Sequence, residues 1–218
     1  MRRVFVDPES PQRDAIQDAG TWIRNRGVIA IPTDTLYGLA ADPCSAAAVA
    51  RVFDVKGREA TQALPLIAAD VAQVVAHLGV LTETGRRLAE KFWPGPLTLL
   101  VAAPQTLARG VTGGTGKIGV RVPADAVARA ICADVGAPIT ATSANRSGEP
   151  ATADPDVVER TLGGRLDLLI DVGRTKGGAA STIVDVSGGE PVLVRAGAIS
   201  WDDIQAWLHS DPAPQHAR

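Results

Sequence analysis

Short runs of apolar residues alternate along the chain with stretches in which apolar positions recur every three or four residues. The first pattern predicts buried strands and the second predicts amphipathic helices. The predicted strands span residues 4–6, 28–31, 39–41, 64–69, 97–101, 118–122, 138–142, 168–171, 181–186 and 192–195. The predicted helices span residues 11–27, 45–53, 71–77, 82–92, 125–135, 157–162 and 201–208. This alternation predicts an α/β domain with a mixed β-sheet.

Polar residues mark several of the predicted boundaries. Ser10 followed by Pro11 predicts an N-cap and a first-turn proline for the first helix. Ser45 predicts the N-cap of the second helix. Residues 210–218 are polar and rich in proline, so we expect one domain over residues 1–209 and a flexible tail over 210–218.

Composition narrows the class of protein. Of 218 residues, 45% are hydrophobic and 21% are charged, which is typical of a globular protein. A net charge of −2 and few aromatic residues (four Trp, three Phe, one Tyr) disfavour bulk binding of nucleic acid, although a local basic groove stays open. The N-terminus has no apolar segment of a signal peptide, and no apolar run reaches the ~18 residues of a membrane span. We therefore expect a cytoplasmic protein without a membrane segment.

The cysteines and histidines offer little for catalysis. Cys44 and Cys132 are expected to be buried thiols in a reducing compartment, because two cysteines cannot build a disulfide framework. The sequence contains no cluster of cysteines and histidines of the kind that predicts a metal site. His209 and His216 lie in the tail region and His77 on the surface of a predicted helix, so a Ser-His-Asp triad is not expected.

Two glycine-rich patterns fail on their context. Residues 114–119 match GxGxxG, but a predicted strand follows where a dinucleotide site needs a helix. The same stretch lacks the Ser or Thr of a phosphate-binding loop, since Ile118 follows Lys117. Ser143 does not lie in a GxSxG pattern, so the sequence predicts no nucleophile elbow there.

Hydroxyl groups and cations instead follow the predicted strands and helices. Thr33 and Thr35 come directly after a buried strand, where α/β sheets bind ligands, although an ordinary turn also explains them. Lys56 and Arg58, separated by a glycine, follow a helix. They either complement the helix dipole or form a phosphate clamp.

The second half of the chain also has hydroxyl groups and cations near the ends of predicted strands. Ser143 and Asn145 follow a buried strand, and Ser181 begins another. In each case a polar turn without a binding role is the alternative explanation. Arg121 lies among apolar strand residues, where an unpaired guanidinium is costly and a carboxylate would suit it. Arg195 ends a strand, where a surface charge is the alternative. Together these residues predict a site that binds anions and positions reactants.

Six segments that contain these residues occur in a distinctive order. They are Pro-Thr-Asp-Thr-Leu-Tyr-Gly-Leu (32–39), Lys-Gly-Arg (56–58), Phe-Trp-Pro-Gly-Pro-Leu-Thr (92–98), Val-Arg-Val-Pro (120–123), Thr-Ser-Ala-Asn-Arg-Ser-Gly (142–148) and Ser-Thr-Ile-Val-Asp (181–185). In this order the chain strongly resembles the YrdC-like family of threonylcarbamoyl-AMP synthases, from about residue 27 to 199.

The resemblance implies a twisted mixed sheet flanked by helices, with one deep basic cavity. It implies synthesis of threonylcarbamoyl-AMP and pyrophosphate from L-threonine, bicarbonate and ATP with Mg²⁺. The product would serve threonylcarbamoyladenosine formation beside the anticodon of tRNA through a separate tRNA threonylcarbamoyl transferase. Weak binding of tRNA or double-stranded RNA stays open.

Position by position, the resemblance also implies roles for individual residues. Lys56, Arg58, Ser143 and Asn145 would hold the nucleotide, with help from Arg195, and Lys56 and Arg58 would offset the charge of the reacting phosphates. Thr33, Arg121, the main chain at Ala141 and Ser181 would bind threonine, with Arg121 on its carboxylate. Glu59 departs from the family's usual proline, and the link to Pro65 is longer than usual.

Two alternatives remain at this stage. A maturation factor of the same fold could bind RNA without synthase activity, although the acidity and scarce aromatics disfavour it. An enzyme that handles carbamoyl-adenylate is the other, although such domains accompany acylphosphatase-like and zinc-finger segments that this chain does not contain.

Overall fold

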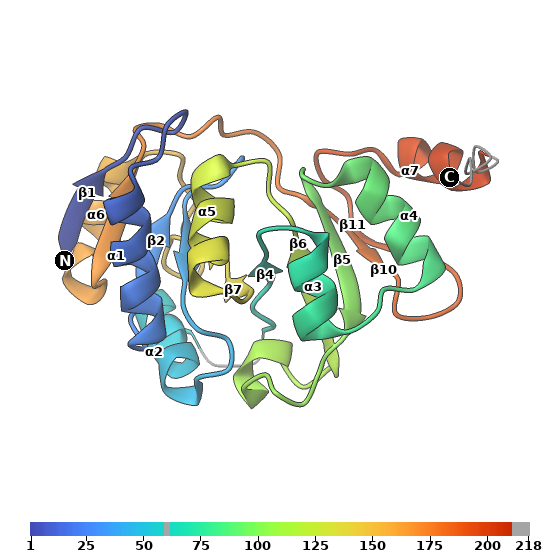
Figure 1. Ribbon diagram of the computed structural model, residues 1–218, viewed down its shortest axis with the longest axis horizontal. Coiled ribbons are helices and arrows are strands. Elements are labelled where there is room, and N and C mark those ends of the chain that lie inside the picture. The colour runs from blue at the N-terminus through green and yellow to red at the C-terminus, as the bar shows by residue number, and fades with distance from the viewer. Residues whose placement is uncertain (59–61, 211–218) are drawn as a thin grey trace.

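The computed structural model describes residues 1–58 and 62–210, and its elements follow the predicted alternation (Figure 1). The strands are β1 (Arg2–Phe5), β2 (Ile29–Ile31), β3 (Gly38–Ala40), β4 (Leu66–Ile67), β5 (Leu97–Ala102), β6 (Lys117–Arg121), β7 (Ile139–Thr140), β8 (Thr142–Ser143), β9 (Leu168–Asp171), β10 (Thr182–Asp185) and β11 (Val192–Arg195). The helices are α1 (Arg13–Arg24), α2 (Ala46–Lys56), α3 (Val71–Leu78), α4 (Glu83–Phe92), α5 (Ala126–Val135), α6 (Pro155–Leu162) and α7 (Trp201–His209), with 3₁₀ turns η1 (Arg109–Thr112) and η2 (Gly163–Arg165).

The strands form two mixed sheets. The first has the order β1-β9-β2-β3-β8, in which β1, β9 and β2 are parallel and β3 and β8 are antiparallel to their neighbours. The second has the order β11-β10-β5-β6-β4-β7, with parallel pairing of β10 with β5 and of β6 with β4. The predicted mixed α/β class is confirmed, as two sheets rather than one.

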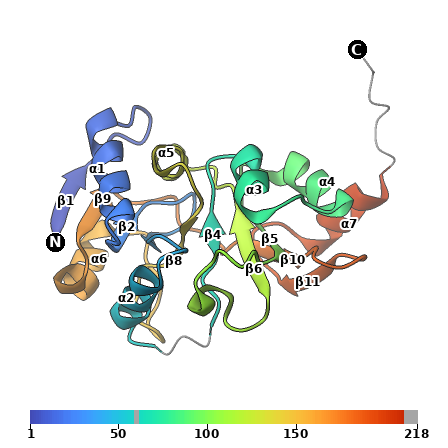
Figure 2. The same cartoon turned by 60° about the horizontal axis from the view of Figure 1, so that its bottom comes forward.

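The two sheets meet at Ala141. Residues 138–142, predicted as one strand, divide into β7 in the second sheet and β8 in the first, and Ala141 is the residue between them. Its amide donates to the carbonyl of Pro65 (2.8 Å), just before β4. Figure 2 shows β4 and β8 side by side in the middle of the molecule. A two-residue strand on either side of one crossing residue therefore joins the sheets.

Helices cover both faces of the first sheet. Alternate residues of β2 enter different cores, because Ile29 and Ile31 pack with α1 and α5, whereas Ala30 packs on the other side with α2 and α6. Such burial on both faces explains the uninterrupted apolar run of this strand. The larger core continues under the second sheet to α3, α4 and α7.

Local polar contacts confirm one predicted helix start and correct another. Ser45 caps α2 by accepting from the amide of Ala48 (3.3 Å). The first helix, however, begins at Arg13 with Gln12 as N-cap residue, not at Ser10 and Pro11. The amides of Glu9 and Ser10 instead donate to the Asp7 carboxylate, which holds this stretch in a turn before the helix.

Three other predictions meet the structure in different ways. Cys132 is buried as expected, but Cys44 is exposed, because it lies in the turn before α2. His77 lies on the exposed face of α3 as predicted. No helix of residues 1–58 and 62–210 is long and apolar enough to cross a membrane. Glu59 and the tail beyond residue 210 lie outside the described part of the chain.

Candidate functional site

A turn after β2 carries the first predicted residues. The Thr33 hydroxyl donates to the carbonyl of Leu36 (2.7 Å) and accepts from the amide of Thr35 (3.2 Å). Thr33 is buried, so these bonds hold the side chain in one orientation. The local turn foreseen as the alternative therefore exists, and it fixes Thr33 at the carboxyl end of β2.

The end of α2 brings Lys56 to the turn that follows β8. The Lys56 ammonium donates to the carbonyls of Ser143 (2.6 Å) and Asn145 (3.1 Å), and the side-chain oxygens of both residues lie within 3.5 Å. Burial and the nearby charge of Arg58 lower the pKa of Lys56 to about 8. Lys56 thus joins two segments that are 87 positions apart in the sequence.

Further bonds make this turn rigid. The Asn145 amide group donates to the carbonyls of Arg146 (2.9 Å) and Glu149 (2.6 Å). The amide of Ser147 donates to the carbonyl of Lys56 (2.8 Å). Lys56, Ser143 and Asn145, predicted as one group, therefore form one hydrogen-bonded unit.

Arg58 belongs to the same region without contacting Ser143. Gly57 adopts a left-handed conformation (φ 63°) that ends α2 and turns the chain. The Arg58 guanidinium lies 5.5 Å from the centre of the Phe53 ring and donates to Gln62 (2.6 Å). Its Nε is buried without a partner among the described residues, and burial lowers its pKa. This cation keeps unused hydrogen-bonding capacity.

Arg121 at the end of β6 has a counter-ion that the sequence reasoning did not assign. Its Nη1 donates to the carboxylate of Asp34 (2.7 Å), and only 10% of each side chain is exposed. Burial lowers the pKa of Arg121, while the charges of Asp34 and Asp125 oppose that shift. A lone arginine among apolar strand residues is a signal that such an acidic partner exists, and Asp34 stood inside the quoted motif.

Arg195 and Ser181 form a second cluster with Arg121, whose charge acts on Arg195. Arg195 is exposed on the edge strand β11, yet it donates to the carbonyl (2.6 Å) and hydroxyl (3.2 Å) of Ser181. The Ser181 hydroxyl also pairs with that of Thr98 (2.8 Å). Burial and the charge of Arg121 lower the pKa of Arg195, since the two guanidinium groups are close enough to repel.

The junction of the sheets brings three predicted site residues together. Gly38 pairs with Ser143 across β3 and β8. A Cβ atom at Gly38 would lie 3.8 Å from the Thr33 methyl group and 3.9 Å from the Cα of Ala141. Thr33, Ala141 and Ser143 are therefore neighbours, so two residues predicted to bind threonine lie beside one predicted to bind the nucleotide. The depth and charge of a cavity there stay predictions.

Tyr37, not singled out from the sequence, supports the turn at Thr33. Its buried hydroxyl donates to the carbonyl of Gly173 (2.7 Å) and accepts from the amide of Val172 (3.2 Å). Thr175 and Gly177 both donate to the carbonyl of Thr35 (2.7 and 2.9 Å). The loop after β9 is thus tied to the turn after β2.

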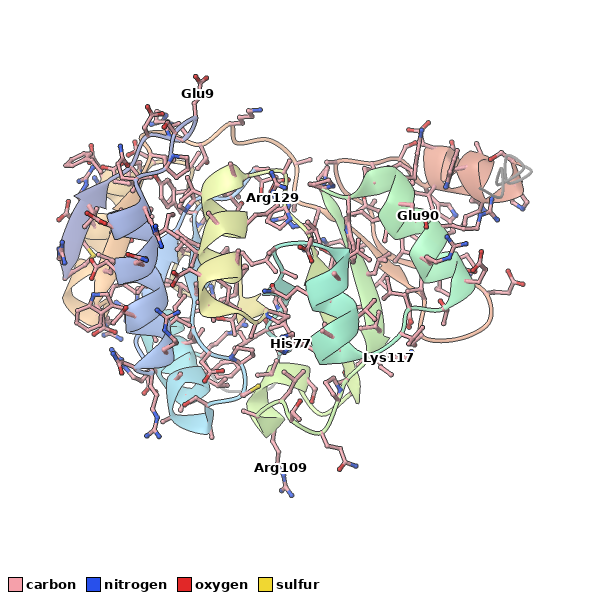
Figure 3. The ribbon with its side chains drawn as sticks, viewed as in Figure 1. Glu9, His77, Glu90, Arg109, Lys117 and Arg129 are labelled. Carbon is pink, nitrogen blue, oxygen red and sulfur yellow. The ribbon has the colours of Figure 1, made fainter. Side chains whose placement is uncertain are left out.

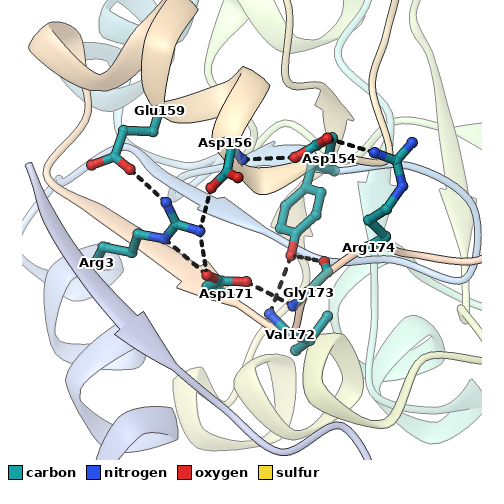
Figure 4. A network of polar contacts seen from close by, with 9 residues as sticks. Arg3, Asp154, Asp156, Glu159, Asp171, Val172, Gly173 and Arg174 are labelled. Atoms are coloured by element: carbon teal, nitrogen blue, oxygen red, sulfur yellow. Dashed lines mark hydrogen bonds and ion pairs between the residues drawn. The ribbon is translucent and has the colours of Figure 1, made fainter.

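A charged network fixes the start of that loop (Figure 4). Arg3 on β1 pairs with the buried Asp171 (2.6 Å) and with Asp156 and Glu159 of α6. The other oxygen of Asp171 accepts from the amide of Gly173 (2.7 Å). The edge strand, α6 and the loop against Tyr37 are therefore connected by one carboxylate.

The arrangement can bind anions and hold two reactants side by side. It contains four cationic side chains, several fixed hydroxyl groups and one buried carboxylate, and the described residues near it include no histidine. His77 instead lies on α3, as Figure 3 shows, and His209 lies near Thr84 and Trp201. Within the described residues no three His, Cys, Asp or Glu side chains group as metal ligands.

Comparison with known proteins finds a family model, two relatives and a solved structure that are similar to this chain. The family model Sua5_yciO_yrdC, described as telomere recombination, matches residues 21–197. A threonylcarbamoyl-AMP synthase of Pyrococcus abyssi is 36% identical over 87% of this chain, and one of Bacillus subtilis is 35% identical over 94%. The crystal structure of P. abyssi Sua5 complexed with L-threonine superposes with a TM-score of 0.90 at 33% identity over 96% of this chain and 61% of that one. The chain spans 56% and 60% of the lengths of the two synthases.

Proposed function

The chain belongs to the Sua5–YciO–YrdC family, and from this premise we propose that it joins L-threonine, bicarbonate and ATP into threonylcarbamoyl-AMP and releases pyrophosphate. One observation carries the proposal. Lys56 is hydrogen-bonded to Ser143 and Asn145, and Thr33 and Ala141 lie next to Gly38, which pairs with Ser143, so residues assigned to the nucleotide and to threonine are neighbours. The relatives carry the same activity in their names.

The nucleotide is bound by the first cluster. Lys56 and Arg58 lie at the end of α2 with positive charge, and the Arg58 Nε has no partner among the described residues, which suits phosphate oxygens. The turn beside them carries the Ser143 hydroxyl, and the Asn145 amide group that we assign to the same site is held by the carbonyls of Arg146 and Glu149. Arg195 adds a further cation next to Ser181. Mg²⁺ enters with ATP as part of that substrate, held by its phosphates.

Threonine is bound by the second cluster. The structure of P. abyssi Sua5 contains L-threonine, which supports this substrate. Arg121 donates one N–H group to Asp34 and keeps others for the carboxylate of threonine. We assign Thr33, Ser181 and the main chain of Ala141 to the same substrate; Thr33 and Ala141 lie next to Gly38, and the Ser181 hydroxyl accepts from Arg195.

The reaction uses binding and electrostatics rather than a protein nucleophile. The threonine amine forms a C–N bond with bicarbonate and water leaves, which gives an N-carboxylate; this carboxylate then attacks the α-phosphorus of ATP while pyrophosphate leaves. Fixed cations at Lys56 and Arg58 stabilise the charge that develops on the phosphates. The product serves threonylcarbamoyladenosine formation in tRNA through a separate transferase, in the cytoplasm where ATP and tRNA occur.

Omission of each substrate in turn tests the proposal. Pyrophosphate is measured with ATP, Mg²⁺, bicarbonate and L-threonine, then without each one, and serine replaces threonine as a matched control. We expect pyrophosphate only in the complete mixture. Threonine-independent ATP turnover would refute the synthase function, and salt-sensitive RNA binding without turnover would favour the RNA-binding alternative. Turnover with carbamoyl phosphate in place of threonine would favour the carbamoyl-adenylate alternative.

A further inference from the structure

A cavity lies at the carboxyl ends of the parallel strands β1, β9 and β2, beside Thr33. Its volume is about 380 Å³, and its lining includes Thr33, Asp34 and Asp125 together with residues 8–9 and 174–176. Figure 3 shows Glu9 and Arg129 at this same end of the molecule. Of the residues predicted to bind substrates, Thr33 alone lines this cavity. No role has yet been assigned to it.

Asp34 separates this cavity from Arg121. One carboxylate oxygen of Asp34 accepts from the Arg121 guanidinium (2.7 Å), and only 10% of the Asp34 side chain is exposed. The same side chain lines the cavity. A proton on this carboxylate would therefore have a short path to the solvent of the cavity.

The proposed reaction needs such a path. The ammonium of a free amino acid has a pKa above the ~8 of a chain terminus, because its own carboxylate stabilises it, so it is mostly protonated at neutral pH and has no lone pair for attack on bicarbonate. A base must take that proton. Histidine is the usual choice, but His77 and His209 line other cavities, away from Thr33.

The geometry brings an ammonium group to Asp34. If the substrate carboxylate occupies the remaining N–H groups of Arg121, one carbon atom separates it from the ammonium, which then lies near Thr33 and Asp34. The Thr33 hydroxyl donates to the carbonyl of Leu36 and lies 3.2 Å from both the amide and the hydroxyl of Thr35, so its bonds are made within the turn. The carboxylate of Asp34 is then the acceptor that an ammonium group there requires.

We propose that Asp34 takes the proton from the ammonium of the bound amino acid and that Asp125 relays it through the cavity to solvent. In the first step the N–H bond breaks and an O–H bond forms on Asp34, which gives a neutral amine. The amine then attacks bicarbonate, a C–N bond forms, and water leaves with the displaced oxygen. Asp34 passes its proton to Asp125 and returns to the carboxylate. This inference rests on the proposed function.

The charges around Asp34 act in opposite directions. Arg121 on β6 stabilises the ionised carboxylate, whereas the negative charge of Asp125, just before α5, favours uptake of the proton. Burial, with a contribution from Asp34, raises the pKa of Asp125, so this carboxyl takes up a proton more readily than an exposed one. The other charged groups there are Arg129 on α5, Glu9 on the loop after β1, Lys176, and Arg174, which pairs with Asp154 (2.5 Å).

Asp34→Asn removes the base and keeps an oxygen for Arg121. We expect pyrophosphate formation at saturating ATP and threonine to fall about 10²-fold at pH 7. The rate of the variant should then rise roughly tenfold per pH unit up to ~8, as free amine becomes available, while the wild-type rate stays nearly flat. A structural role for Asp34 would lower the rate by the same factor at every pH.

Asp125→Asn tests the relay. Asparagine is also a good N-cap, so α5 keeps the bond that Asp125 accepts from Ala128 (2.8 Å). We expect a loss of about tenfold in kcat without a change in the KM for threonine. Asp70→Asn is the matched control, because Asp70 caps α3 in the same way outside the cavity.

The outcomes separate the two proposals. If the wild-type protein forms no pyrophosphate, the proposed function fails and the proton route fails with it. If the wild type is active but Asp34→Asn is fully active or loses activity equally at every pH, only the proton route is overturned. An Asp125→Asn variant indistinguishable from Asp70→Asn would overturn the relay.

Discussion

Replacing Arg58 by alanine distinguishes a residue that binds phosphate from one that supports the fold. The Arg58 side chain makes two polar contacts with described residues. It donates one hydrogen bond to Gln62 and lies over the Phe53 ring. Its Nε is buried with no partner among the described residues, which is costly in the folded protein and is relieved by the substitution.

The expected loss of stability is therefore small. An exposed cation–π contact contributes ~0.5–1 kcal/mol and a single hydrogen bond about 0.5–1.5 kcal/mol. Relief of the buried Nε offsets part of this, so the free energy of unfolding of Arg58→Ala should fall by no more than about 2 kcal/mol. Removing one fixed donor from a charged transition state lowers kcat by roughly 10²–10³-fold. Activity should therefore be lost from a folded protein.

Two assays check this contrast. Pyrophosphate release in the complete substrate mixture gives kcat, and urea unfolding gives the free energy of unfolding. Arg165→Ala serves as the control. Arg165 donates to the carbonyl of Asp54 on α2 (3.1 Å), the helix that ends just before Arg58, but it is not among the predicted site residues. Wild-type turnover by Arg58→Ala, or an equal loss of activity in Arg165→Ala, would refute the role assigned to Arg58.

Three further predictions follow from buried polar contacts. Lys56→Met should abolish most pyrophosphate formation and lower the free energy of unfolding, measured in urea, by about 1–3 kcal/mol, because two carbonyls of residues 143–145 lose their donor. ATP affinity, measured by calorimetry, should fall as the pH rises through the Lys56 pKa of about 8, since the neutral amine cannot pair with phosphate, and Lys56→Arg should remove this dependence. Tyr37→Phe should lower the free energy of unfolding by about 1–3 kcal/mol, because the carbonyl of Gly173 loses its donor; unchanged stability would show that this bond does not hold the loop.

The sequence alone predicts much of the fold because local patterns report local structure. Apolar runs and 3–4 spacing located most strands and helices, and Ser45 marked the start of α2. The family resemblance rests on six short segments, and the family itself is confirmed. Boundaries were less certain where turns compete, as at Ser10, where Asp7 holds a turn that delays α1 to Arg13.

The site depends on contacts that no local pattern contains. The sequence indicated that Arg121 needs a carboxylate, but only the pairing of β6 beside β4 and the turn after β2 show that Asp34 is its partner. Residues 138–142 are predicted from the sequence as one strand, yet tertiary hydrogen bonding divides them between two sheets at Ala141. The bond from Lys56 to Ser143 crosses 87 positions. Hydrogen bonds and ion pairs between distant segments form only when the chain has packed, so residue types and their order follow from the sequence, whereas their partners follow from the tertiary structure.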